Sequence, residues 1–160
     1  MGVSMNFGVN KSVPSPRTYL YEYTIKPSVG ASQLPEEFMI SRLPDVKNQG
    51  SVNSCCACAA AEILEILTLQ EFGKKINFSE GYIYGRCRSA SGRYKGMYPD
   101  LLVEELRKKG SIPKDLYDKC YEMPEMQELL NNNPNILKMD ALAEKYKIEG
   151  YVAFWGRKYQ

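Results

Sequence analysis

The sequence contains no histidine among its 160 residues, and this absence limits the chemistry that the chain can perform alone. Imidazole is the side chain most often used to move protons in catalysis, because its ordinary pKa of about 6.5 lies near physiological pH. A nucleophile in this chain therefore has no imidazole from the same 160 residues to accept its proton.

A long hydrophobic run is also missing. The most apolar stretch, 57–69, is interrupted by Glu62 and Glu65 and is too short to cross a bilayer. The N-terminus has no basic region followed by an apolar core, so no secretory signal is visible. Asn6 occupies the position where a myristoylation signal has Ser or Thr. We therefore expect no membrane partner and a cytoplasmic location.

Neither a strong net charge nor a disulfide framework is present. The formal net charge is +2 and the basic clusters alternate with acidic stretches, so we expect no nucleic-acid partner. The five cysteines are an odd number, and three of them fall within 55–58, which is not the pattern of a secreted disulfide scaffold. A Cys87–Cys120 disulfide stays open, although a reducing compartment disfavours it.

The most informative stretch that is present runs from Asn48 to Ala61. A polar, turn-forming segment leads directly into a helical pattern, and Ser54 is a suitable N-cap because its hydroxyl can accept from a first-turn amide. Cys55 then becomes the first residue of the helix, where the exposed amides and the helix dipole stabilise a thiolate. The side-chain amide of Gln49 and the backbone amide of Cys55 could together stabilise an oxyanion.

This stretch resembles the nucleophile segment of the papain-like cysteine peptidases. The matching residues read Gln49-Gly50-Ser51-x-x-Ser54-Cys55-x-Ala57. The resemblance implies that Cys55 is the catalytic nucleophile and Gln49 the oxyanion donor. It also implies a peptide or protein substrate, hydrolysis through a thioester, and no cofactor or metal.

Four positions depart from the family pattern. Val52 stands where most members have a disulfide cysteine, which fits a protein that folds without that bond, and Asn53 replaces a glycine that lets the backbone approach substrate. Cys56 stands in place of a tryptophan and Cys58 in place of an aromatic residue. We expect substrate approach and local packing to differ from those of the family.

The resemblance covers only the front of a papain-like enzyme. Its histidine lies roughly 130–150 residues after the cysteine, which falls beyond Gln160, and its asparagine lies further on. We therefore expect an α+β family fold of which this chain holds the mostly helical left-hand domain, with the β-rich right-hand domain absent. The expected division is an extended arm at 1–33, the helical domain at 34–147 and, at 148–160, a strand that would enter the missing domain.

Capping residues and apolar spacing predict the remaining elements. We expect helices at 55–72, 100–109 and 124–130, a short one that Ser79 caps and that runs through Tyr84, and a further one after Asn133-Pro134. Ala57, Ala60, Ile63, Leu64 and Leu67 are predicted to form the buried face of the first helix. Residues 19–25 and 148–155 are typical of strands.

The segment before the third helix resembles a Gly-Gly-Tyr-Pro-like element of the family that binds substrate. The resemblance assigns substrate binding to Gly96, Tyr98 and Pro99. A simple glycine-containing turn with a core tyrosine explains the same letters. Both interpretations stay open at this point.

Two other function classes compete with the peptidase interpretation. One is a non-catalytic module that binds a peptide or protein, or one half of a split peptidase whose second chain supplies His and Asn. Alternatively, Cys55-x-x-Cys58, with Cys56 and with Cys87 or Cys120, could form a metal or redox site. The second pair of a four-ligand zinc site is missing, so we expect no metal.

Overall fold

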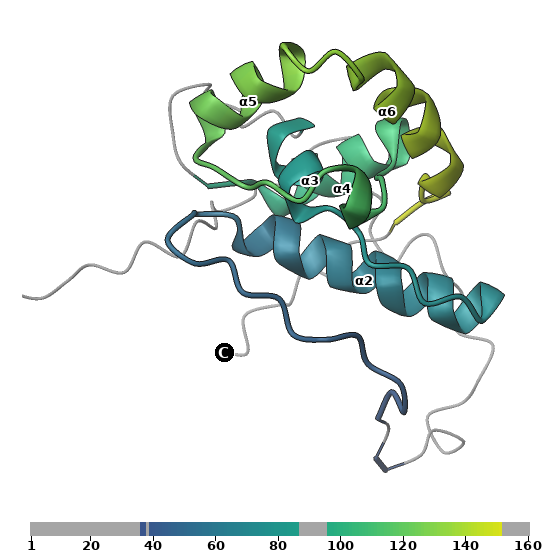
Figure 1. Cartoon of the computed structure of the whole chain (residues 1–160). Helices are drawn as coiled ribbons and strands as arrows, with labels where there is room; N and C mark the ends of the chain where they lie inside the picture. Colours follow the sequence, from purple (N-terminus) through teal and green to yellow (C-terminus); the bar gives the residue numbers. More distant parts are fainter. Residues whose placement is uncertain (1–35, 38, 87–95, 152–160) are drawn as a thin grey trace, which may run out of the picture.

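Helix α2, Cys55–Phe72, is the longest element, and the other helices lie on one side of it (Figure 1). The computed structural model describes residues 36–37, 39–86 and 96–151. Helices α3 (Glu80–Arg86) and α4 (Pro99–Lys109) contact α2 and each other. Helix α5 (Met123–Asn131) contacts α3, and α6 (Ile136–Ala143) follows it. Single 3-10 turns at Lys114–Leu116 and Glu144–Tyr146 complete the order.

The helix boundaries follow the punctuation of the sequence. Helix α2 begins at Cys55 as predicted and ends at Gly73, whose φ of 65° is the left-handed conformation expected of a C-cap glycine. Pro99 begins α4, and Gly110 follows its last residue. The predictions for these helices are therefore confirmed to within a residue or two.

The core lies between α2 and the layer formed by α3 and α4. Every residue of α3 from Glu80 to Gly85 is buried, because α2, α4 and α5 surround it. Gly81 permits this burial, since a Cβ at that position would lie 1.7 Å from the carbonyl oxygen of Lys119. Phe78, next to α3, packs edge-on against the ring of Tyr146, with the ring centroids 5.2 Å apart.

The predicted buried face of α2 is partly wrong. Ala57, Ala60 and Leu64 are buried, but Ile63 is 56% exposed and Leu67 is 39% exposed. The helix is apolar around most of its circumference, so the spacing of apolar residues cannot identify the packed side. The side that α3 and α4 cover is the one with small residues, including Ala61, because these let neighbouring helices approach closely.

The predicted N-cap role of Ser54 is also only half right. Ser54 holds the N-cap position, but its side chain makes no capping hydrogen bond. Its backbone, at φ −107° and ψ 19°, is not extended as in an ordinary N-cap, and its hydroxyl lies 4.0 Å from the sulfur of Cys58. Ser79 does cap α3, since its Oγ accepts from the Tyr82 amide at 3.0 Å.

Within the described ranges, the structure contains no sheet, and the β pairing is a single bridge between Phe78 and Pro113. The predicted strand at 148–155 is not formed over Ile148–Tyr151, and its remainder lies outside the described residues. The predicted strand at 19–25 and the arm at 1–33 also lie outside them. The predicted helical character is confirmed for the described residues, and the three-part division at 33 and 147 stays a prediction.

Candidate functional site

Cys55 is the first residue of α2 and is half-buried. The first turn of any helix presents amides that have no partner inside the helix, and their dipoles favour negative charge on a nearby atom. Here the Cys58 amide bonds to the carbonyl of Ser54 at 3.0 Å, so the helix is regular from its first residue. The structure therefore places the predicted nucleophile at the helix position that the sequence indicated.

Gln49 lies on a tight turn immediately before α2. Its side-chain Nε2 donates to the Val52 carbonyl at 3.0 Å, and the Val52 amide donates back to the Gln49 carbonyl at 3.3 Å. Gly50, at φ 60°, makes the turn, and its amide donates to Asn48 Oδ1 at 2.9 Å. One N–H of the Gln49 amide is thus used to hold the turn, and an amide nitrogen carries a second.

The side chain of Lys47 holds the segment that leads into this turn. Lys47 lies two residues before Gln49, and its side chain is 5% exposed. Its Nζ lies 2.7 Å from Oε1 of Glu65 in α2 and 2.8 Å from Asn77 Oδ1. Its backbone amide donates to Glu62 Oε1 at 3.0 Å. The extended segment before Cys55 is therefore tied to the middle of α2.

The charges around Lys47 extend to α3. Glu65 also accepts from the Phe78 amide at 2.8 Å, and Glu80 lies 3.8 Å from Lys47 Nζ. Lys114 forms a closer ion pair with the other oxygen of Glu80. The buried carboxylates of Glu65 and Glu80 are thus balanced by Lys47 and by the half-buried Lys114, which is the pairing that buried charges require.

Cys56 and Cys58, which follow Cys55 in α2, are ordinary buried thiols. Burial, with the Cys55 thiol beside it, raises the pKa of Cys56 to about 12. Burial also raises the pKa of Cys58 and of Cys120. Thiols of this kind stay protonated and unreactive at neutral pH.

The arrangement of the cysteines bears on the metal and disulfide hypotheses. None of Cys55, Cys56, Cys58 and Cys120 is in a disulfide, and Cys87 lies outside the described residues. In the part of the chain that the structure describes, no group of three or more His, Cys, Asp or Glu side chains is placed to hold a metal ion. No helix among these residues is long and apolar enough to span a membrane.

The predicted substrate-binding segment runs alongside the start of α2. Gly96 is buried with φ 98°, Tyr98 is half-buried at the N-cap of α4, and Pro99 is exposed. The sulfur of Cys56 lies 3.9 Å from the carbonyl oxygen of Met97. The segment therefore lies next to the residue that follows the predicted nucleophile, although Cys56 and Met97 are 41 positions apart in sequence.

Sequence reasoning missed Glu122. Its Oε1 accepts from Asn53 Nδ2 at 3.0 Å, and its Oε2 lies 3.4 Å from the Tyr84 hydroxyl. Asn53 belongs to the turn before Cys55, so Glu122 contacts the candidate site although it lies 69 positions further along the sequence. Nothing in the local pattern around Glu122 distinguishes it from a glutamate that merely precedes a helix.

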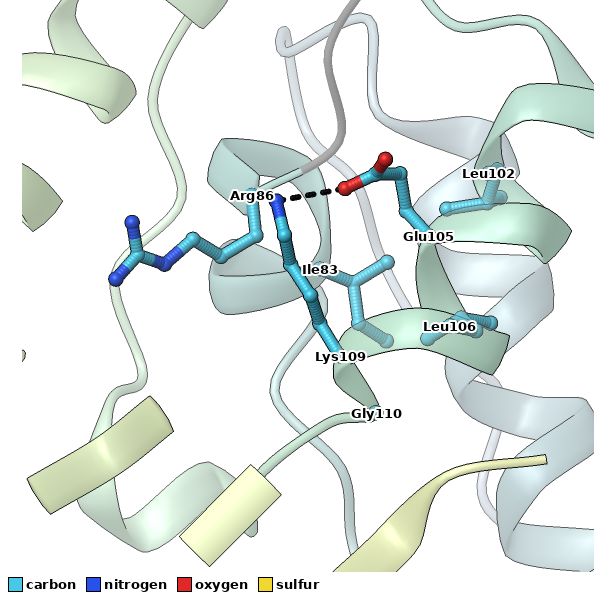
Figure 2. A pocket seen from close by; sticks show the side chains of 7 residues that line it. All are labelled: Ile83, Arg86, Leu102, Glu105, Leu106, Lys109 and Gly110. Atoms are coloured by element: carbon cyan, nitrogen blue, oxygen red, sulfur yellow. Dashed lines mark ion pairs between the residues drawn. The ribbon is translucent and has the colours of Figure 1, made fainter. Parts of the chain in front are cut away.

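Two hollows lie away from this site. A cavity of about 10 Å³ lies between α3 and α4. Figure 2 shows Ile83, Leu102 and Leu106 in its wall and the ion pair between Lys109 and Glu105 beside them. Its volume is enough for about one water molecule. An open groove of about 490 Å³ lies between 75–77 and 113–118. Neither is lined by Cys55 or by the turn before it.

The fold that these elements form is papain-like. The structure is similar to the crystal structure of xylellain, a cysteine protease from Xylella fastidiosa, with a TM-score of 0.69. The two chains are 22% identical, and the match covers 92% of this chain and 58% of xylellain. No family model and no curated protein matches the sequence. The similarity establishes the fold, and the chain spans little more than half the length of that neighbour.

Proposed function

We propose that this chain is the nucleophile-bearing part of a papain-like cysteine peptidase. The observation that supports it most is the placement of Cys55 at the first position of α2, directly after the Gln49 turn, in a papain-like fold. The Gly96–Tyr98 segment, which lies beside Cys56, would form one wall of the substrate site.

In the proposed reaction, the Cys55 sulfur attacks a peptide carbonyl and forms a tetrahedral intermediate. The Cys55 amide and the Gln49 side chain stabilise its oxygen, provided that a Gln49 N–H turns from Val52 toward it. Collapse of the intermediate breaks the C–N bond, the amine leaves with a proton, and water then hydrolyses the thioester. Lys47 supports this geometry by holding the segment before the turn.

Proton transfer is the step that these 160 residues do not complete. An amine leaving group needs a proton, and the sequence contains no histidine to supply it. We propose that a histidine outside residues 1–160 performs this step, on a β-rich part of the same polypeptide or on a second chain. The 160-residue chain alone should therefore show no peptidase turnover.

The first experiment measures thiol reactivity. The purified chain is treated with a limiting amount of iodoacetamide at pH 7, and labelling is quantified at each cysteine by peptide mass spectrometry. Labelling should concentrate on Cys55, because Cys56, Cys58 and Cys120 are held as neutral thiols by burial. Equal labelling of Cys55 and Cys120, which are both half-buried, would contradict an activated nucleophile.

A non-catalytic peptide-binding module is the second candidate, and the lack of histidine favours it. In that case a peptide would bind beside Gly96 with equal affinity to the wild type and to Cys55→Ala. The iodoacetamide experiment distinguishes the two candidates, because a binding module has no requirement for a reactive Cys55.

A further inference from the structure

Two parts of the chain that are distant in sequence meet at the carboxylate of Glu122. On one side, Asn53 of the turn before Cys55 donates to Glu122 Oε1 at 3.0 Å. On the other, the hydroxyl of Tyr84 of α3 donates to Glu122 Oε2 at 3.4 Å. Asn53 and Tyr84 are therefore joined through one side chain, although 31 residues separate them along the chain (84 − 53).

The hydroxyl of Tyr84 also forms a hydrogen bond with the backbone of Gly96. Burial raises the pKa of Tyr84, the Glu122 carboxylate raises it further, and a hydrogen bond from the Gly96 backbone opposes both. A backbone N–H that donates to the phenol oxygen has that opposing effect. The set Asn53, Glu122, Tyr84 and Gly96, here called the Glu122 bridge, thus runs from the nucleophile turn to the candidate substrate-binding segment.

The chemistry of Glu122 suits this bridging role. An ionised carboxylate accepts on both oxygens, whereas a neutral amide accepts on only one side and donates on the other. Asn53 and Tyr84 both act as donors to it, and the two carboxylate oxygens accept one hydrogen bond each. Among the described residues no lysine or arginine forms an ion pair with Glu122, and its two oxygens are used by these neutral donors.

The position of the bridge gives it a specific consequence. Residue 52 is a valine and cannot form a disulfide, so no covalent bond from this position anchors the turn. The Cys56–Met97 contact, at 3.9 Å, is a weak hydrogen bond and cannot hold the segment alone. Tyr84 is fully buried, which makes it a rigid support for Glu122.

We propose that Glu122 is a positioning residue for the substrate site: it fixes the Gly96 segment at a set distance from the turn that carries Cys55. This inference rests on the proposed function, since it assigns the binding of a peptide backbone to Gly96. Glu122 acts through Asn53 and Tyr84 and does not take part in the reaction at sulfur.

The test compares two alkylating reagents on the full 160-residue chain. A peptidyl chloromethyl ketone needs the substrate-binding wall, whereas iodoacetamide needs only the Cys55 sulfur. In both cases an S–C bond forms and halide leaves, with the thiol proton going to buffer. The quantity measured is the ratio of the second-order rate constants of the two reagents at Cys55.

Glu122→Ala should lower this ratio roughly tenfold, the effect of losing one oriented hydrogen bond, while the iodoacetamide rate stays within about twofold. Glu125→Ala, an exposed glutamate of α5 with no role in the bridge, is the matched control and should leave the ratio unchanged. An unchanged ratio in Glu122→Ala would overturn the proposal, and so would an equal loss with both reagents.

A double-mutant cycle keeps the test decisive if Glu122→Ala alone loosens the fold. Asn53→Ala breaks the same bridge from a half-exposed turn, where the chain tolerates substitution better. The two substitutions should be non-additive in the ratio, because either one already breaks the bridge. Additive effects would show that the two residues act independently and would reject the bridge.

Failure of the proposed function gives a different result. In that case iodoacetamide labels Cys55 and Cys120 equally in the wild-type chain. The chloromethyl ketone then reacts with Cys55 no faster than iodoacetamide does, and the ratio is already low before any substitution. A preference for Cys55 that survives Glu122→Ala together with an unchanged ratio would leave the nucleophile intact and reject only the positioning role.

Discussion

At the scale of single residues, two serines show how much a sequence can predict. Ser54 and Ser79 both immediately precede a helix, and both positions were predictable as N-caps. Only Ser79 caps with its hydroxyl, which also donates to the Tyr117 carbonyl, while Ser54 faces Cys58. The sequence identifies the position, but the direction of the hydroxyl depends on neighbours that the fold brings together.

Lys47 is a second residue whose surroundings the sequence does not reveal. Lysine is rarely buried, and next to Asn48 and Gly50 it is typical of an exposed turn. Its burial becomes explicable only when Glu65 and Glu80, from two different helices, are placed around it. The charge balance comes from pairs of residues 18 and 33 positions apart (65 − 47 and 80 − 47), which no local pattern records.

We predict that Lys47→Met lowers the free energy of unfolding by about 3–5 kcal/mol, because it leaves the buried Glu65 carboxylate without its cation. Lys75→Met is the matched control, since Lys75 pairs with Asp45 at the surface, where side chains are 72% and 94% exposed. It should change stability by less than about 1 kcal/mol. Urea denaturation followed by far-UV circular dichroism measures both, and similar losses in the two variants would contradict a buried ion cluster.

At the scale of elements, α4 was the most predictable helix, because its signals are local. Pro99 at its start, Gly110 after its end and the pairs Glu104–Lys108 and Glu105–Lys109 are all within one stretch of sequence. Both pairs are present in the structure, at 3.4 Å and 2.7 Å, and Arg107 also pairs with Glu104 at 2.9 Å.

The charges of α4 give a pH prediction. Hydrogen bonds from Arg107, and also from Lys108, lower the pKa of Glu104 from 4.5 to about 2. A lowered carboxyl pKa stabilises the folded state above the unfolded value of 4.5, and this contribution is lost as pH falls toward 2. Glu104→Gln should therefore destabilise the chain at pH 7 by less than about 1 kcal/mol, since Arg107 and Lys108 are exposed to solvent, and by less still at pH 2.5.

The measurement is the difference in unfolding free energy between wild type and Glu104→Gln at pH 7 and at pH 2.5. Salt at about 1 M should shrink the difference at pH 7, because the Debye length then falls to about 3 Å and the attraction between surface charges is screened. A difference that grows at acidic pH would show that Glu104 is not stabilised by Arg107.

Helix α2 was predictable in its extent and not in its orientation. Its bounds depend on Ser54 and Gly73, which are local, whereas its packed side depends on where α3 and α4 lie. Ile63 and Leu64 are adjacent and similar in hydrophobicity, yet one is 56% and the other 5% exposed.

This contrast makes a direct test. Leu64→Ala should cost about 2–5 kcal/mol, because it leaves a cavity between α2 and the α3–α4 layer. Ile63→Ala, one residue away, should change stability by about 0.5 kcal/mol or less in the 160-residue chain. Thermal or urea unfolding of both variants decides it, and comparable losses would mean that the exposed side of α2 is packed.

At the scale of the whole molecule, the segment from Gln49 to Cys55 predicted the papain-like fold, because its residues are contiguous and form a motif that is visible in the sequence. The approach of Gly96 and Met97 to Cys56 could only be expected from the family resemblance. Glu122 was missed altogether, since its role depends on Asn53 and Tyr84 meeting it from distant parts of the chain. Local signals thus predict the nucleophile, and long-range packing decides what surrounds it.

The lack of histidine leads to a prediction about leaving groups. An amine must be protonated as it leaves, whereas p-nitrophenolate leaves as an anion without help. The 160-residue chain should therefore be acylated by a p-nitrophenyl ester of a short peptide, releasing up to one equivalent of p-nitrophenol, while the p-nitroanilide of the same peptide is not cleaved. The Cys55 thiolate forms the thioester in this reaction, and its hydrolysis should be slow without a base to activate water.

The matched control is Cys55→Ala, which should release p-nitrophenol no faster than buffer does, while Cys120→Ala should behave as the wild type. Detecting an acyl group on Cys55 by intact-protein mass spectrometry would identify the thioester directly. Cleavage of the p-nitroanilide by this chain, lost in Cys55→Ala, would show that some other group in these 160 residues supplies the proton. Because Glu122 is held by Asn53 and Tyr84, we do not expect it to fill that role.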